Sequence, residues 1–240
     1  MHLSVIIPAY NEEKRLPKTL ANIDGYLSRQ SYDYEILVVD NGSTDKTAEI
    51  ARVFSSQFLG LKLVEGKFGR GKGYAVKMGM IAAQGDYRLF ADADNSTSID
   101  QVEKMWPEFE KGFDVVIGSR DVKGAVLDPP QPWLRRVVLG DGFKLYRKII
   151  IGLWGIEDTQ CGFKAFTKRA AEDIFPKSRV EHFAFDPEIL LIAKKFGYKI
   201  KEIPVRWKND LASKVKISSM VNMAIDLLKI KINLLKGVYG

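Results

Sequence analysis

Short apolar segments alternate with helical patterns through the first half of the chain. Mainly apolar runs predict strands at residues 3–8, 34–40, 61–64, 87–91 and 114–118. Apolar residues at helical spacing predict helices between them, at residues 16–28, 45–56, 73–83 and 99–110. Strands that lack polar alternation and are separated by helices predict an α/β fold, with a mainly parallel sheet flanked by helices on both faces.

The alternation stops at residues 121–142. This segment contains Gly124, Pro129, Pro130 and Pro132, and it ends in a second glycine-containing cluster at residues 140–142. These glycine and proline residues predict a long loop, and long loops in compact domains are usually lids or binding segments. Helical and strand patterns resume at residues 143–153, 168–175, 187–196 and 199–204.

The C-terminal residues predict an amphipathic helix. From Ser218 onward, polar residues recur at spacings of four and three, at Asn222, Asp226, Lys229, Asn233 and Lys236. Most other positions are Met, Ile, Leu or Val, which gives a broad apolar face. This face either packs on its own domain or lies in a membrane interface. We therefore expect two parts, a catalytic-type domain over residues 1–217 and the amphipathic helix over residues 218–240.

Composition narrows the classes of site. The chain has 240 residues, one cysteine (Cys161) and two histidines, so an internal disulfide and a cysteine-rich zinc site are excluded. Any metal is expected to be a hard ion held by oxygen. The chain begins directly with a predicted strand, and no apolar run reaches about 18–20 residues. We therefore expect no signal peptide, no transmembrane helix and a cytoplasmic location.

The net charge of +7 is concentrated near the C-terminus. Residues 194–240 hold 11 Lys or Arg against 3 Asp or Glu, an excess of +8, so the preceding residues sum to −1. This asymmetry favours an anionic partner such as a membrane surface or a lipid phosphate, although a solvated basic surface has the same pattern. No nucleic-acid-binding motif accompanies it, so we expect no nucleic-acid partner.

Three acidic motifs each follow a predicted strand. Asp92-Ala93-Asp94 follows the strand at residues 87–91, and the other two motifs occupy residues 8–13 and 40–45. In parallel sheets, ligands bind at the carboxyl ends of the strands, so the three motifs are expected to converge. Asp92 and Asp94 are the predicted ligands of Mg²⁺ or Mn²⁺, which would neutralise a diphosphate.

Local chemistry gives further candidates. Pro8 and Tyr10 could flank a nucleotide base, although Tyr10 could equally pack in the core, and Glu12 is available to the base edge or the ribose. Asp40 closes a buried strand, where an unpaired carboxylate is costly, so a base N–H or a ribose hydroxyl is its expected partner. The run from Gly69 to Gly73 lacks the Gly-Lys-Ser/Thr ending and the glycine spacing of a phosphate-binding P-loop, which excludes a P-loop NTPase.

The ordered motifs resemble family 2 glycosyltransferases of the GT-A, Rossmann-like fold. The matching segments are residues 4–13 (SVIIPAYNEE), 38–45 (VVDNGSTD), 71–73 (GKG), 92–94 (DAD) and 118–120 (GSR). Residues 158–164 (DTQCGFK) and 185–188 (FDPE) resemble dolichyl-phosphate glucosyltransferases, which are relatives of dolichyl-phosphate mannosyltransferases. The mannosyl enzymes have a glutamine two residues after the second Asp, where this chain has Ser96, which leaves the choice of metal open.

The resemblance implies a set of functional residues. The implied donor-binding residues are Pro8, Tyr10, Glu12, Val38, Asp40, Lys72, Asp92, Ala93, Asp94, Arg120, Lys208 and Lys214. Arg120, Arg135 and Arg136 are implied for the acceptor phosphate. The implied catalytic residues are Asp94, Arg120, Asp158 and Lys164. Asp158 could orient a substrate or form only structural hydrogen bonds.

The implied reaction is inverting transfer of a hexose to dolichyl or polyprenyl phosphate. UDP-glucose is the favoured donor and GDP-mannose the alternative, and the enzyme would be peripheral on the cytoplasmic face of a membrane. A phosphate acceptor is already anionic, so no strong general base is needed, which suits a chain with little histidine. Other readings are a family 2 enzyme acting on a polysaccharide or glycolipid, a nucleotidyltransferase and an inactive binding protein. The nucleotidyltransferase signature belongs just after the first strand, where residues 8–13 stand instead.

Overall fold

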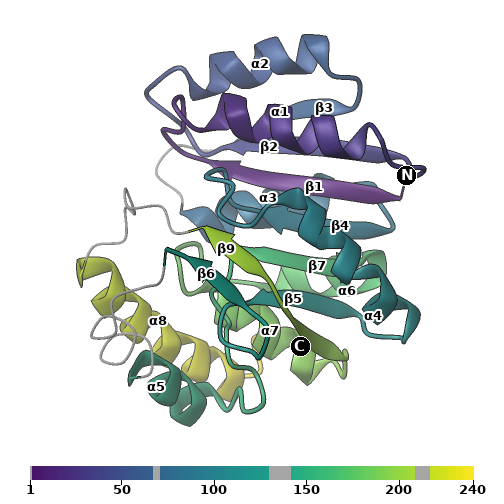
Figure 1. Ribbon diagram of the computed structural model, residues 1–240. Coiled ribbons are helices and arrows are strands. Elements are labelled where there is room, and N and C mark those ends of the chain that lie inside the picture. The colour runs from purple at the N-terminus through teal and green to yellow at the C-terminus, as the bar shows by residue number, and fades with distance from the viewer. Residues whose placement is uncertain (1, 67–70, 130–141, 209–216) are drawn as a thin grey trace.

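The fold is built on a seven-stranded sheet. The computed structural model describes residues 2–66, 71–129, 142–208 and 217–240. The strands of the sheet are β1 (Leu3–Ala9), β2 (Tyr34–Asp40), β3 (Leu61–Glu65), β4 (Tyr87–Ala91), β5 (Val115–Ser119), β7 (Phe163–Thr167) and β8 (Ile200–Pro204). Their order is β3-β2-β1-β4-β7-β5-β8 (Figure 1). All neighbouring pairs are parallel except those of β7, which runs antiparallel to β4 and β5.

Helices cover both faces of the sheet, as the sequence predicts. One face packs against α1 (Leu16–Leu27), α2 (Thr47–Gln57), η1 (Ile99–Lys104) and α4 (Trp106–Glu110). The other packs against α3 (Lys72–Ala82), α5 (Gly142–Ile151), α6 (Lys168–Ile174), η3 (Phe175–Lys177), α7 (Phe185–Lys195) and α8 (Ile217–Leu235). The α/β prediction of a sheet flanked by helices is thus confirmed.

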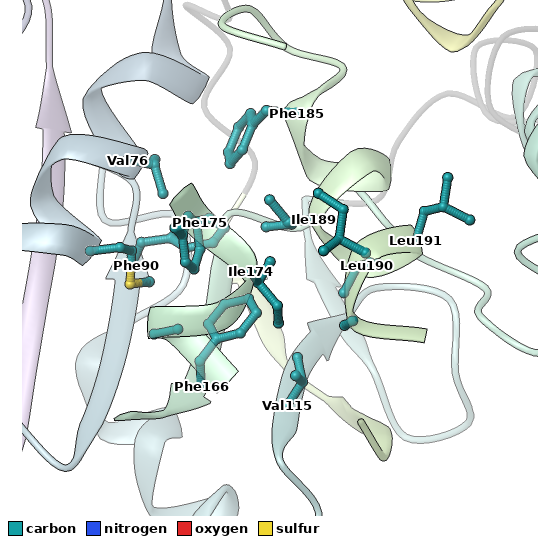
Figure 2. Close-up of a cluster of buried hydrophobic side chains, with 14 of the residues drawn as sticks. Val76, Phe90, Val115, Phe166, Ile174, Phe175, Phe185, Ile189, Leu190 and Leu191 are labelled. Atoms are coloured by element: carbon teal, nitrogen blue, oxygen red, sulfur yellow. The ribbon is translucent and has the colours of Figure 1, made fainter. Parts of the chain in front are cut away.

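Successive strand residues pack into opposite cores. In β1, Ile6 belongs to the core under α3 and α7, whereas Val5 and Ile7 belong to the core under α1. Figure 2 shows the first of these cores, where Phe90 of β4 lies between Phe166 of β7 and Phe185 of α7. Each fully buried side chain of this size contributes about 1.5–3 kcal/mol through removal from water. These contacts fix α7 against the end of the sheet.

The strand register brings the acidic motifs to one edge. Ala9 at the end of β1 is paired with Asp40 at the end of β2. On its other side, β1 pairs with β4 from Leu3 opposite Tyr87 to Ile6 opposite Phe90. Since neighbouring strands lie only about 4.8 Å apart, the ends of β2 and β4 flank the end of β1. Asp40 and Asp94 therefore open onto the same carboxyl edge of the sheet.

Several elements differ from the sequence prediction. The expected helix at residues 99–110 is divided into η1 and α4, because Pro107 begins a new helix in its first turn and lacks the N–H that would continue the first. β7 was not predicted. Within the expected loop at residues 121–142, β6 (Val126–Asp128) pairs with β9 (Arg206–Lys208) to form a second, two-stranded sheet.

α8 packs on the domain and still leaves apolar residues in solvent. Met223, Leu227 and Ile230 are buried in the core shared with α7, and α8 lies beside α5 (Figure 1), where the Tyr146 hydroxyl donates to Ala224 O. Asp226, expected on the polar stripe, is buried and accepts a hydrogen bond from Lys229. Among the α8 residues whose side chains are described, 221–235, the exposed large apolar ones are Val221, Ile225, Leu228, Ile232 and Leu235. Among the helices that the structure describes, none has the length and apolar character needed to cross a bilayer.

Candidate active site

Hydrogen bonds join the loops that follow β1 and β2. The N–H of Asn11 donates to Ser43 Oγ at 3.0 Å, and the N–H of Thr44 donates back to Asn11 Oδ1 at 2.8 Å. The N–H of Glu12 donates to Thr47 Oγ1 at 2.8 Å. Asn11 adopts a left-handed conformation (φ 53°), which asparagine tolerates better than most residues. The two predicted nucleotide-binding loops thus form one rigid surface.

The residues predicted to contact the base lie on or beneath this surface. Tyr10 is 46% exposed, so it does not pack in the core. Glu12 forms an ion pair with Arg15 at 2.6 Å. Val38 is buried inside β2, where it supports the surface from below. Asp40 is buried as well, and its carboxylate accepts hydrogen bonds from the N–H and hydroxyl of Ser43, so it shapes the turn after β2.

The Asp92–Asp94 turn projects from the end of β4. Ala93 is buried, and its carbonyl accepts a hydrogen bond from Thr19 of α1 at 2.7 Å. Asp94 Oδ1 accepts from the N–H of Ser96 at 2.9 Å, and Asn95 between them is left-handed (φ 54°). Burial, followed by the neighbouring Asp92 carboxylate, raises the pKa of Asp94. A cation at this turn would relieve the repulsion between the two carboxylates.

Asp92 is held from two sides. Lys72, the first residue of α3, places its Nζ 2.5 Å from Asp92 Oδ1. On the other side, the carboxylate lies against the backbone of Gly162, where an added Cβ would come within 2.0 Å of Asp92 Oδ2. Only glycine therefore fits at residue 162. The segment before β7 and the start of α3 thus converge on the first carboxylate of the motif.

Lys164 and Asp186 form a buried ion pair behind Asp92. Both side chains are almost completely excluded from solvent, and Lys164 Nζ also lies 5.1 Å from the centre of the Phe90 ring. Burial raises the pKa of Asp186, although Lys164 and then Lys72 oppose this shift. Lys164, predicted as catalytic, thus holds α7 against β7 in the structure. Asp186 was not among the predicted site residues, although the segment 185–188 that contains it was part of the family resemblance.

Arg120 and Asp158 form a second ion pair beside the site. The Arg120 Nε and Nη2 atoms donate to the two oxygens of Asp158 at 2.7 and 3.0 Å. Burial opposes the charged form of Asp158, but Arg120 and neighbouring backbone N–H groups lower its pKa well below the ordinary range. The guanidinium also lies 5.4 Å from the centre of the Trp207 ring. Asp158 thereby fixes the orientation of Arg120.

β9 connects the Asp92–Asp94 turn to Arg120. The N–H of Lys208 donates to Ser96 O at 2.7 Å, and Trp207 forms a bridge with Thr97. Lys208, predicted to bind the donor, therefore lies next to the Asp92–Asp94 turn. Three further predicted residues, Arg135, Arg136 and Lys214, lie outside the described residues.

The donor set fits a hard divalent cation. Asp92 and Asp94 offer carboxylate oxygens, whereas the described part of the chain contains no group of three or more His, Cys, Asp or Glu side chains that could hold a metal. Mg²⁺ is commonly bound in this way, through one or two carboxylates together with phosphate oxygens of the substrate and water. The site is therefore suited to a cation that arrives with a diphosphate.

Comparisons with solved structures confirm the GT-A fold. Mannosyl-3-phosphoglycerate synthase from Rubrobacter xylanophilus is similar with a TM-score of 0.72 at 17% identity, covering 99% of this chain and 74% of that one. Glucosyl-3-phosphoglycerate synthase from Mycobacterium tuberculosis, in a complex with Mn²⁺, UDP and glucosyl-3-phosphoglycerate, is similar with a TM-score of 0.67 at 17% identity, covering 97% and 79%. At these identities the likeness concerns the fold.

Sequence relatives are closer. The dolichyl-phosphate β-glucosyltransferase ALG5A of Trichomonas vaginalis is 39% identical over 97% of this chain and 73% of its own length. The dolichyl-phosphate β-glucosyltransferases of Dictyostelium discoideum and Homo sapiens are 36% and 34% identical, over 100% and 99% of this chain and 76% and 77% of their own lengths. The model of the family "Glycosyl transferase family 2" matches residues 4–175. The chain is therefore a glycosyltransferase and belongs to glycosyl transferase family 2.

Proposed function

We propose that this enzyme transfers glucose from UDP-glucose to dolichyl or a related polyprenyl phosphate, with inversion at the anomeric carbon. The observation that carries the proposal is the similarity to dolichyl-phosphate β-glucosyltransferases, which extends over 97–100% of the chain. It includes the segments around Asp158 and Asp186 as well as the nucleotide-binding half. The names of these relatives support glucose as the sugar, and the UDP complex of a structural neighbour supports a uridine nucleotide.

The nucleoside is proposed to bind on the joined loops after β1 and β2. Tyr10 is sufficiently exposed to stack on a base. Glu12 and Asp40 are proposed to bind hydroxyl or N–H groups of the nucleoside. Lys72 and Lys208 flank the Asp92–Asp94 turn and would attract the diphosphate as point charges. Lys214 is proposed for the same role.

Asp94, with Asp92, would hold Mg²⁺ or Mn²⁺ at the diphosphate. When bound, the cation would neutralise the negative charge that grows on the leaving group. The carboxylates of this turn would orient the diphosphate so that its bond to the sugar faces the acceptor. The fit rests on the two oxygen donors described above.

The transfer is proposed as a single displacement. An anionic oxygen of the acceptor phosphate forms a bond to the anomeric carbon, while the bond from that carbon to the diphosphate oxygen breaks and its electron pair leaves with UDP. No proton has to be removed from the acceptor, so positioning and electrostatics supply most of the rate. Asp158 would act by orienting Arg120, and the bidentate bond uses two of the five N–H donors of Arg120. Arg120, Arg135 and Arg136 would bind the acceptor phosphate.

The lipid would approach from the side formed by α5 and α8. Both helices carry exposed apolar residues, among them Leu145 and Ile149 of α5 and Ile225 and Ile232 of α8. Lys229 and Lys236 are exposed on or just beyond α8 and suit anionic headgroups. This combination supports peripheral attachment to the cytoplasmic face of a membrane, with the apolar side chains in the interface.

A donor and acceptor screen tests the proposal. The enzyme is supplied with UDP-glucose or GDP-mannose, with polyprenyl phosphate in detergent or with soluble glycans, and release of nucleotide diphosphate is measured. We expect release from UDP-glucose that depends on polyprenyl phosphate. Activity with GDP-mannose alone would identify a mannosyltransferase, and transfer to glycans alone would refute the lipid acceptor. Asp94→Asn, with folding verified by circular dichroism, should lower turnover at least about a hundredfold.

A further inference from the structure

Lys72 occupies the position of a cation on the metal-binding turn. Its Nζ lies 2.5 Å from Asp92 Oδ1, and its side chain is only 21% exposed. The pair connects the first turn of α3 to the end of β4. A divalent ion approaching Asp92 therefore meets an ammonium group already bound to that carboxylate.

Lys72 is held in this position by its surroundings. Gly71 and Gly73 on either side lie so close to residues 180–185 that an added Cβ would come within 2.3 Å of Glu181 O or 2.6 Å of Phe185 Cβ. The N–H of Tyr74 donates to Glu181 O at 3.1 Å. Figure 2 shows Phe185 and Val76 of α3 facing each other in the core below. The start of α3, and with it the backbone of Lys72, is thus fixed beside the Asp92–Asp94 turn.

Lys72 also stays charged. A lysine side chain is protonated at neutral pH, and its ammonium group is bound to the Asp92 carboxylate. The turn therefore contains two acids with one of them neutralised by an internal cation. As stated above, the described residues offer no third acidic or histidine ligand at this point.

We propose that Lys72 is an internal competitor of the metal, which keeps the donor-free enzyme from binding a divalent cation tightly and moves to the diphosphate when the nucleotide binds. The proposal rests on the function proposed above, and it adds that the binding of the metal depends on the binding of the nucleotide. On leaving Asp92, Lys72 would give up a carboxylate as its anionic partner, and the diphosphate of the nucleotide would replace that partner. Metal and nucleotide would consequently bind in concert, and a metal-only enzyme would be scarce.

The test measures Mn²⁺ binding by the whole chain without sugar or lipid. Electron paramagnetic resonance follows the loss of the free Mn²⁺ signal, with and without UDP. We expect K72M and K72Q to bind Mn²⁺ about tenfold more tightly than the wild type when UDP is absent, in the range of typical coupling between sites. The factor by which UDP tightens Mn²⁺ binding should shrink in both variants. K72R keeps the charge and should resemble the wild type.

Lys111→Met is the matched control. Lys111 is paired with Glu108 on α4, at the opposite edge of the sheet, so the variant changes the net charge equally and should leave Mn²⁺ binding unchanged. The proposal is overturned if folded K72M and K72Q bind Mn²⁺ no more tightly than the wild type, or if the effect of UDP is undiminished. Because no transfer is measured, this result is independent of the donor and acceptor screen.

Discussion

Arg120, just after β5, forms an ion pair with Asp158, in the segment before β7, and both oxygens of the acid are bound to the one guanidinium. Asp158 Oδ2 also accepts the N–H of Arg120, and its Oδ1 accepts the N–H groups of Gln160 and Cys161. This carboxylate therefore orders the turn that ends at Gly162 as well as the arginine. Asp158 thus connects Arg120, predicted to bind the acceptor phosphate, to Gly162, whose backbone lies against Asp92.

Asp158→Asn tests the energetic role of this pair. The substitution keeps the shape of the side chain but leaves Arg120 without its counter-charge, and breaking a buried pair costs about 3–5 kcal/mol. Since the Arg120 side chain is 23% exposed, we expect the lower end of that range for the free energy of unfolding in urea at neutral pH. Glu157→Gln, at the neighbouring half-exposed ion pair with Lys148, should cost less than about 1 kcal/mol. Equal losses in the two variants would contradict this role.

The same acid predicts how stability depends on pH. The pKa of Asp158 is lower in the folded protein than its ordinary value of 3.8, so the folded state binds this proton less readily than the unfolded state. The stabilisation is therefore complete above pH 3.8 and declines as the pH falls below it. Urea unfolding at pH 7, 5, 4 and 3 should show the difference between wild type and Asp158→Asn constant from pH 7 to 5 and smaller at pH 3. A difference that grows on acidification would reverse the sign of the assigned shift.

Gly162→Ala tests the wall behind Asp92. The added methyl group would overlap Asp92 Oδ2, so the carboxylate has to turn away from its present position between Lys72 and the backbone. Displacement of a site residue by about 1 Å can cost about a hundredfold in rate, and we expect a loss of that size in glucosyl transfer. The thermal unfolding midpoint should stay close to that of the wild type, so the loss of rate would not reflect unfolding.

Gly25→Ala is the control for that substitution. Gly25 lies within α1, where nothing stands within 4 Å of an added Cβ, so alanine should stabilise the protein by about 0.5–1 kcal/mol and leave activity unchanged. If Gly162→Ala retains full activity, Asp92 does not need the position seen in the structure.

Much of the fold follows from the sequence because β1, β2 and β4 are continuous apolar runs between helical patterns. Their parallel arrangement places the acids after each strand at one edge, so residues far apart in the chain can be assigned to one site by topology alone. β7 was not predicted from its five residues, which include the charged Lys164. Lys164 can be buried because it forms an ion pair with Asp186, which lies 22 residues further along the chain and is not identified by any local pattern around β7.

The orientation of charged side chains could not be predicted in the same way. The family resemblance implied that Lys72 and Arg120 bind substrate phosphates and that Arg120 and Lys164 are catalytic. In the structure each of the three faces a carboxylate of the chain, namely Asp158, Asp92 and Asp186. These pairings depend on how β5, α3 and α7 pack around the carboxyl edge, which is long-range information.

Removing the exposed apolar residues of α8 tests the attachment to membranes. Ile225 and Ile232 are each about half exposed and lie on the face that is not packed against the domain. Glutamate at both positions would remove at least about 1 kcal/mol of interfacial burial per site, so we expect binding to vesicles of phosphatidylcholine and phosphatidylserine to weaken at least about thirtyfold. Flotation or sedimentation with the vesicles measures this.

Leu59→Glu is the matched control for α8. Leu59 is 99% exposed in the turn before β3, on the far side of the sheet from α8, so it alters surface hydrophobicity and charge without touching the proposed interface. The Leu59 variant should bind vesicles like the wild type, and the α8 variant should keep the wild-type thermal midpoint because its packed face is intact. Transfer to polyprenyl phosphate in vesicles should then fall in the α8 variant. Undiminished vesicle binding by that variant would mean that the exposed apolar residues of α8 do not hold the enzyme at a lipid surface.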